Sequence, residues 1–243
     1  RMFSCRELMG VGALLLAVGA GIAYAVSERL VLGPVGDTFA PSMALGTAGF
    51  TAALGIVRME DNGLAPDKGP VIVTGATGGV GDMAVDMLAG LGYHVVALTG
   101  KEDQQDYLRG LGAAEVKLTS SIDHTKVRPL EASQWAGAVD NVGGPMLDRL
   151  AAHMKPYGKI AIAGMIESGV TMTVLPFVLR SVDILGINVS RQLDMPERRR
   201  LWQRMATDLK PRHLPMISRP IPFEALDRTM DSFFNVSTVG RVV

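Results

Sequence analysis

The sequence predicts an α/β fold in which helices cover both faces of a doubly wound parallel sheet. Short apolar runs alternate with helical stretches through the middle of the chain, and a glycine-rich turn joins the first such run to a helix. Strands that alternate with helices imply a parallel sheet, whose buried strands are continuously apolar. The 243 residues are 48% hydrophobic, with a mean hydropathy of +0.24, which is enough apolar material for a large core.

Each predicted element rests on its apolar pattern. A helix from Met43 to Val57 follows Pro41 and Ser42, because Ser is a favoured helix cap. The predicted strands are Val71 to Thr74, His94 to Thr99, Glu115 to Leu118, Ala136 to Asp140, Lys159 to Ala163 and Val182 to Val189. The predicted helices between and after them are Val80 to Leu91, Asp103 to Leu111, Met146 to Met154 and Glu197 to Leu209.

The N-terminal segment, residues 1–40, is atypical for such a fold. Residues 8–26 contain no charged side chain, and this stretch is nearly long enough to span a membrane, which takes about 20 residues. A secretory signal is a second interpretation, because Ala23-Tyr24-Ala25 resembles a cleavage site. An ordinary buried helix and a stretch that is not native to the gene are two further interpretations. All four stay open.

The C-terminal tail, residues 211–243, also differs from the middle of the chain. Prolines at positions 211, 215, 220 and 222 interrupt regular structure. We expect a short helix from Phe223 to Phe234 and a last strand from Gly240 to Val243.

Charge and composition exclude several classes of function. The chain has 24 basic and 24 acidic side chains and a pI near 7.1, so we expect no nucleic-acid partner, since such binding depends largely on phosphate neutralisation. The single cysteine excludes an internal disulfide framework and a zinc lobe of four thiolates. The histidines have no metal-ligand spacing, so we expect no metal site; they are His94, His124, His153 and His213.

The glycine-rich turn is the most informative segment. Gly78, Gly79, Val80 and Gly81 follow a buried strand and open an apolar helix, which is the context of a dinucleotide-binding fingerprint. Glycines allow the backbone to approach a pyrophosphate, and the amides that open the helix can bind the anion. Ala76 replaces the first glycine of the usual pattern. The sequence therefore predicts a Rossmann domain over residues 41–210 that binds a dinucleotide at this turn. The alternative to dinucleotide binding is a tight strand-to-helix turn without a ligand.

The end of the second predicted strand indicates which dinucleotide binds. NAD sites usually place Asp or Glu about 20 residues beyond the glycines. Here the segment reads Thr99-Gly100-Lys101, and a hydroxyl with an ammonium suits the 2′-phosphate of NADPH. The alternative is that Lys101 is a solvated turn residue.

Two later turns follow strands whose carboxyl ends meet the same crevice. Asn141 follows the strand that ends at Asp140, and Met165 follows the strand that ends at Ala163. We expect both positions to pass beside the nicotinamide, or else to be simple chain reversals.

Five motifs, taken in order, identify a family by resemblance. They are Thr47 to Ala52, Gly75 to Gly81, Trp135 to Gly144, Leu175 to Arg180 and Pro196 to Arg200. Together they resemble the zinc-independent quinone oxidoreductase branch of the medium-chain dehydrogenase/reductase superfamily, and most of all its acrylyl-CoA reductase type. The resemblance runs from about Ala40 to Val243.

The resemblance implies an NADPH-dependent oxidoreductase that reduces an activated carbon-carbon double bond, as in an enoyl-CoA thioester, or a quinone. It assigns the pyrophosphate to Gly78 through Gly81 and the 2′-phosphate to Thr99, Gly100 and Lys101, with Thr119 where the family often has an Arg. It also implies a cytoplasmic protein and a homodimer formed through the sheet edge at Val182 to Val189.

The resemblance fails ahead of Thr47. Family members carry there a GroES-like domain of more than a hundred residues, which holds much of the substrate pocket, whereas about 40 unrelated residues precede this helix. In the family the last strand of the tail returns to pair with that domain, so here it would lack its usual partner. We assign no catalytic residue, because the resemblance places the proton donor in that domain. The rival interpretation is a non-catalytic NADP-binding module, tethered to a membrane by residues 8–26. The run Arg198 to Arg200 could attract a CoA or phosphate group, or could be a solvated helix face.

Overall fold

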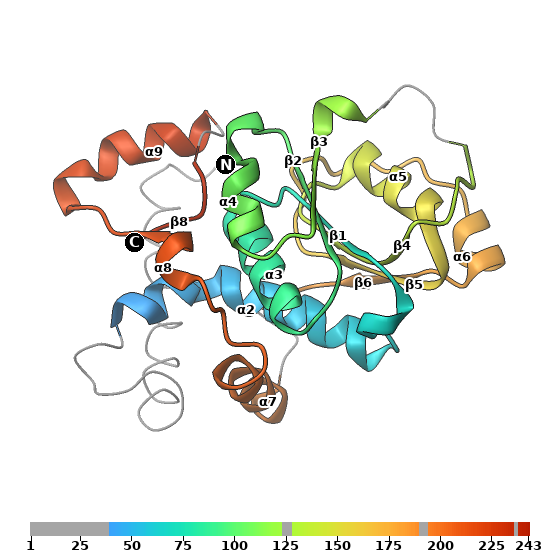
Figure 1. Ribbon diagram of the computed structural model, residues 1–243, viewed down its shortest axis with the longest axis horizontal. Helices are drawn as coiled ribbons and strands as arrows, with labels where there is room; N and C mark the ends of the chain where they lie inside the picture. Colours follow the sequence, from blue (N-terminus) through green and yellow to red (C-terminus); the bar gives the residue numbers. More distant parts are fainter. Residues whose placement is uncertain (1–38, 123–127, 190–193, 236–237) are drawn as a thin grey trace, which may run out of the picture.

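A six-stranded parallel sheet forms the centre of the computed structural model, which describes residues 39–122, 128–189, 194–235 and 238–243 (Figure 1). The strand order is β3-β2-β1-β4-β5-β6, and every neighbouring pair is parallel. The strands are β1 (Val71–Thr74), β2 (Val95–Thr99), β3 (Glu115–Leu118), β4 (Trp135–Asp140), β5 (Met154–Ile162) and β6 (Asp183–Gly186). The predicted doubly wound fold is confirmed, with its topological switch between β1 and β4.

Helices cover both faces of this sheet (Figure 1). The α-helices are α2 (Phe39–Asp61), α3 (Gly79–Gly90), α4 (Gln105–Gly110), α5 (Gly144–His153), α6 (Leu175–Arg180), α7 (Met195–Ala206), α8 (Leu214–Ile217) and α9 (Leu226–Phe234). Short 3-10 turns lie at Pro66–Lys68, Glu102–Gln104, Thr119–Ser121 and Phe223–Ala225. Along β1, Val71 and Val73 pack with residues of α2 and α3, whereas Ile72 packs with residues of α5. This alternation follows from the two-residue period of a strand.

Several elements differ from their expected bounds. The last strand of the sheet, β6, spans only Asp183–Gly186 instead of Val182 to Val189, because an edge strand is held from one side and half of its residues are exposed. Helix α2 is longer than expected and is kinked at Gly46, whose φ of 41° suits glycine. Helices α6 and α8 were not predicted as helices. The N-terminal stretch 8–26 lies outside the described residues.

The C-terminal strand pairs with another segment of the tail, and its expected lack of the GroES-like partner stays a prediction. Strand β8 (Arg241–Val242) pairs in parallel with β7 (Ser218–Arg219), with Ser218 opposite Arg241. Gly240, immediately before β8, has a φ of 68° and donates its amide to the Thr77 carbonyl at 3.0 Å. The tail therefore packs on the α/β domain itself.

Two arginines of the run at 198–200 hold α7 against α2. Arg200 binds Asp61 through both guanidinium nitrogens, and Arg198 lies 5.8 Å from the Phe50 ring centroid. Arg198 also donates to the Val189 carbonyl at 2.8 Å. Arg198 and Arg200 thus have a packing role, so these two do not form a purely solvated helix face.

Among the described residues, one helix segment, Pro41–Asp61, is long and apolar enough to cross a membrane. Its most apolar window is 72% buried inside the protein. It packs against α3, α7 and the sheet, which is the position of a core helix.

Candidate functional site

The glycine-rich turn leaves β1 at Thr74 and enters α3 at Gly79. Gly75 has a φ of 56° and accepts a hydrogen bond from the Gly78 amide at 2.9 Å. A Cβ atom at Gly81 would lie 2.3 Å from the Gly75 carbonyl oxygen, so only glycine fits where α3 packs on the turn. No side chain caps α3 at Gly78. The first amides of a helix lack intrahelical acceptors, so they are available to an anion.

The ends of β1 and β4 are joined by one buried carboxylate. Asp140 accepts hydrogen bonds from the Thr74 hydroxyl (2.6 Å) and from the amides of Val142 (3.2 Å) and Gly143 (3.0 Å). The Thr74 hydroxyl oxygen in turn accepts a hydrogen bond from the backbone amide of Asn141 at 3.0 Å. This network fixes the path of the chain at the topological switch.

Asn141, a predicted site residue, lies beside the glycine turn, where a Cβ atom at Gly75 would be 3.4 Å from its own Cβ. Its Nδ2 donates to the Thr74 carbonyl at 2.7 Å. Its Oδ1 is buried and has no hydrogen-bond partner among the described residues. A buried acceptor without a donor costs free energy, so this atom indicates a place for a donor from a ligand.

The turns after β4 and β5 lie together. A Cβ atom at Gly164 would come within 2.2 Å of the Asn141 carbonyl oxygen, and Gly143 forms a parallel bridge with Glu167. Met165, between them, is 82% exposed. The structure thus brings Met165 to the same edge of the sheet as Asn141, with its side chain in solvent.

The segment that ends β2 has a buried hydroxyl and a partly buried ammonium. Thr99 accepts a hydrogen bond from the Lys101 amide (3.1 Å), and its hydroxyl lies 3.3 Å from that of Thr77. The Lys101 ammonium donates to the Thr238 carbonyl, and partial burial lowers its pKa. An ammonium has three donors, and the Thr238 carbonyl takes one of them among the described residues. Gly100 is exposed, and a Cβ atom there would lie 4.0 Å from the hydroxyl oxygen of Thr119, which follows the end of β3.

The C-terminal tail supplies site residues that the sequence analysis missed. The Arg241 side chain lies against Gly79, where a Cβ atom would be 2.8 Å from its Cδ. Its Nε donates to the Ala44 carbonyl at 3.1 Å. Together with the bonds at Thr77 and Lys101, this contact brings a second cation to the glycine turn. In the sequence the Gly240-Arg241 pair indicates simply part of a strand, because nothing near it in the chain marks a ligand site.

Asp82 is a second residue that the sequence analysis missed. It lies in the first turn of α3 and is fully buried. Burial raises the pKa of its carboxyl to about 7, although the Tyr107 hydrogen bond and the positive charge of Arg241 act to lower it.

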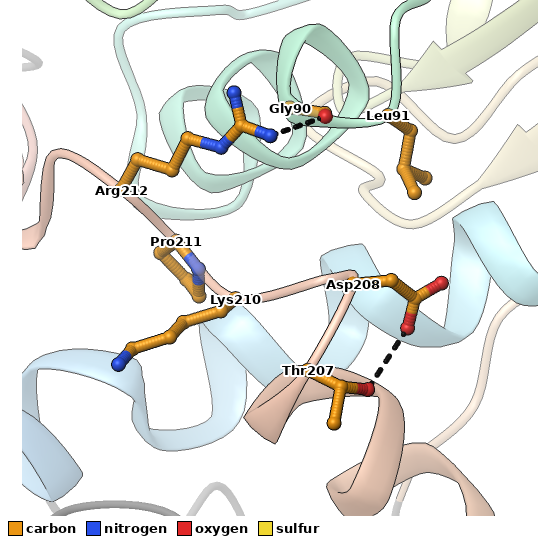
Figure 2. Close-up of a pocket in the computed structure, with 7 residues that line it drawn as sticks. All are labelled: Gly90, Leu91, Thr207, Asp208, Lys210, Pro211 and Arg212. Atoms are coloured by element: carbon orange, nitrogen blue, oxygen red, sulfur yellow. Dashed lines mark hydrogen bonds between the residues drawn. The ribbon is translucent and has the colours of Figure 1, made fainter.

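A surface pocket of about 610 Å³ lies elsewhere, between the last turn of α3 and the segment after α7 (Figure 2). Arg212 donates to the Gly90 carbonyl there and so closes the carboxyl end of α3. A helix of 12 residues is about 18 Å long, so this pocket is distant from the glycine turn. The described residues contain no group of three or more acidic, His or Cys side chains placed to hold a metal ion.

Comparison with known proteins identifies a family and several relatives. A family model described as zinc-binding dehydrogenase matches residues 79–206. The acrylyl-CoA reductase AcuI of Ruegeria pomeroyi is 44% identical over 218 residues, which are 89% of this chain and 66% of the relative. The resemblance found in the sequence is therefore confirmed.

Two solved structures match the fold closely. The Bacillus subtilis protein yhfP with NAD bound has a TM-score of 0.80 and 44% identity, over 86% of this chain and 64% of that one. The yhdH oxidoreductase of Salmonella enterica in complex with NADP has a TM-score of 0.80 and 36% identity, over the same shares. The chain thus spans just under two thirds of the length of these relatives.

The contact at Gly81 leads to a test of the turn. We expect Gly81→Ala to lower the free energy of unfolding by about 1–3 kcal/mol, because its Cβ atom would overlap the Gly75 carbonyl oxygen. Gly169→Ala is the control, since nothing lies within 4 Å of that position, and it should change stability by less than about 0.5 kcal/mol. Urea unfolding followed by circular dichroism measures both, and equal stability of the two variants would contradict the tight packing at Gly81.

Proposed function

The chain belongs to the zinc-binding dehydrogenase family, and from this premise we propose that it binds NADPH at the glycine turn and reduces an activated carbon-carbon double bond or a quinone. The observation that carries the proposal is the turn itself, which opens a helix at the topological switch of the sheet without a capping side chain. Members of this family are oxidoreductases.

The residues of the site fit a phosphorylated dinucleotide. Gly78 is exposed where a pyrophosphate would approach, Gly79 lies half-buried beneath the Arg241 side chain, and Gly81 lets the helix pack close to the turn. Arg241 and Lys101 add two positive charges near the turn and near the end of β2. The unpartnered Oδ1 of Asn141 suits a hydroxyl or amide donor of the bound nucleotide.

The relatives support NADPH and the reaction class. The Salmonella enterica structure contains NADP, and the Ruegeria pomeroyi relative is an acrylyl-CoA reductase. When bound, NADPH supplies a hydride, and the protein supplies its orientation. Substrates of the enoyl-CoA thioester or quinone class follow from these relatives, and Thr99, Gly100, Asn141 and Met165 remain proposed contacts to the nucleotide. We assign no catalytic acid.

A second candidate function is a module that binds NADP without turnover. The chain spans just under two thirds of the length of its relatives, and a dinucleotide-binding fold does not by itself imply catalysis. Tethering of such a module to a membrane would depend on residues 8–26. A cytoplasmic location is proposed for the enzyme by analogy with its relatives.

Turnover separates the two functions. We expect the purified chain to oxidise NADPH when acrylyl-CoA or a simple quinone is added, which the loss of absorbance of the reduced nicotinamide measures. Binding of NADPH without such oxidation would instead favour the module. Absence of NADPH binding to folded protein would contradict both.

Lys101 should determine the choice between the two dinucleotides. We expect Lys101→Ala to weaken NADPH binding about 10- to 100-fold and NADH binding little, because a hydrogen bond to a charged group contributes about 1.5–3 kcal/mol and only NADPH carries the 2′-phosphate. Lys68→Ala is the control, since Lys68 is exposed beside Asp67. Fluorescence titration measures the dissociation constants. Equal losses for NADPH and NADH would remove this role from Lys101.

The sheet edge supports a homodimer. Strand β6 has one neighbour in the sheet, Ile184 is 38% exposed, and exposed apolar side chains of α6, Val178 and Leu179, lie nearby in sequence. We expect sedimentation velocity to give a dimer and Ile184→Lys to give a monomer, because a charge on an edge strand disfavours edge pairing. Met195→Lys, on exposed α7 surface, should leave the dimer intact. A monomer in the unaltered chain would contradict the interface.

A further inference from the structure

Asp82 is a buried carboxyl group that has no part in the proposed reaction. Its Oδ1 accepts the Met83 amide at 2.7 Å, and its Oδ2 accepts the Tyr107 hydroxyl at 3.1 Å. It lies in the first turn of α3, on the helix whose opening amides form the proposed pyrophosphate site. Since burial raises its pKa to about 7, the carboxyl is partly protonated near neutral pH.

Three titratable or charged side chains act on Asp82, and they come from α4, α3 and β8. Tyr107 is supplied by α4 and hydrogen-bonds to the carboxyl. Asp86, one turn further along α3, raises the pKa of Asp82, but its own carboxylate is paired with His213 at 2.9 Å. From β8, Arg241 lowers the pKa of Asp82 by its positive charge. Among the described residues that act on Asp82, Arg241 is thus the positively charged side chain.

The same arginine lies at the glycine turn. Its side chain contacts Gly79 and donates to the Ala44 carbonyl, so its charge sits between α2 and the start of α3. Gly240 packs beside the carboxyl, where a Cβ atom would lie 3.4 Å from the Asp82 Oδ2. The Arg241 guanidinium would therefore attract both the ionised Asp82 carboxylate and an anion bound at the turn.

We propose that binding of the dinucleotide at the glycine turn is coupled to the uptake of a proton by Asp82, an inference that rests on the proposed function. The pyrophosphate brings two negative charges to the amino end of α3 and engages the charge of Arg241. Both effects make the ionised carboxylate less favourable. A proton from solvent then binds the carboxylate oxygen, and no bond of the dinucleotide forms or breaks.

Linkage fixes the direction of the pH effect. Below about pH 7 the carboxyl is already protonated in the free protein, so binding takes up no proton and affinity is constant. Above that pH the free protein is ionised, and NADPH affinity falls by up to about tenfold per pH unit, as expected for one proton. The decrease ends where the carboxyl is ionised in the complex as well.

Calorimetric titration with NADPH tests the coupling. For the unaltered chain, from about pH 6 to about pH 9, we expect the dissociation constant to rise several-fold above neutrality. In the same range the binding enthalpy should differ between phosphate and Tris buffers, because the buffer supplies the proton. Asp82→Asn should lose both effects. Subtracting the variant from the unaltered chain removes the titration of the NADPH 2′-phosphate, which is common to both.

Two further variants locate the effect. Tyr107→Phe removes a hydrogen bond that stabilises ionised Asp82, so the decrease in affinity should begin at higher pH. This variant keeps the carboxyl and covers the case in which Asp82→Asn fails to fold. His94→Gln is the matched control, because it removes an imidazole ring that pairs with Glu115 at the amino ends of β2 and β3, at the opposite edge of the sheet from the glycine turn, and it should keep the original pH profile.

The outcomes separate this inference from the proposed function. NADPH binding by Asp82→Asn with an unchanged pH profile and unchanged buffer dependence would overturn the coupling and leave the function intact. An unshifted profile in Tyr107→Phe would overturn it in the same way. Absence of NADPH binding to the folded, unaltered chain at any pH would overturn the function, and the coupling with it.

Discussion

The carboxylate of Asp140 is the constraint on which the rest of the site depends. It is fully buried at the end of β4 and is satisfied by the Thr74 hydroxyl and by two amides of the turn that follows. A buried carboxylate requires its donors, so separating the ends of β1 and β4 would remove the Thr74 hydroxyl from it and leave it only the two turn amides. Asn141 is thereby held beside the glycine turn. Its side-chain Nδ2 donates to β1, and its Oδ1 has no hydrogen-bond partner among the described residues.

The local features of the fold and of the site could be predicted from the sequence. Each of these features depends on a few neighbouring residues: the glycine turn, the segment at Thr99 to Lys101, and the alternation of strands and helices. In the structure the turn follows β1 and the segment follows β2, at the carboxyl edge of one sheet. The length of β6 could not be predicted, since its apolar run continues beyond the point where pairing with β5 stops. Burial from one side only ends the strand, and no local pattern encodes that.

Arg241 and Asp82 were missed for a different reason. Their importance comes from the return of the tail to α3, a contact between residues far apart in the sequence. Spacing rules describe neighbours within one element, so they indicate neither a cation arriving from β8 nor a carboxyl that is buried by that arrival. An Asp in the first turn of a helix is ordinarily read as favourable to the helix dipole, and only its burial beside Tyr107 and Gly240 changes its acid strength.

The closure of the tail over the glycine turn has a consequence for how the protein is made. The bonds from Lys101 to Thr238 and from Arg241 to Ala44 join residues separated by 137 and 197 positions. Contacts of such long range carry a large loop-closure entropy, and during synthesis the glycine turn leaves the ribosome well before Arg241. In a nascent chain the proposed nucleotide site therefore stays incomplete until translation has reached β8.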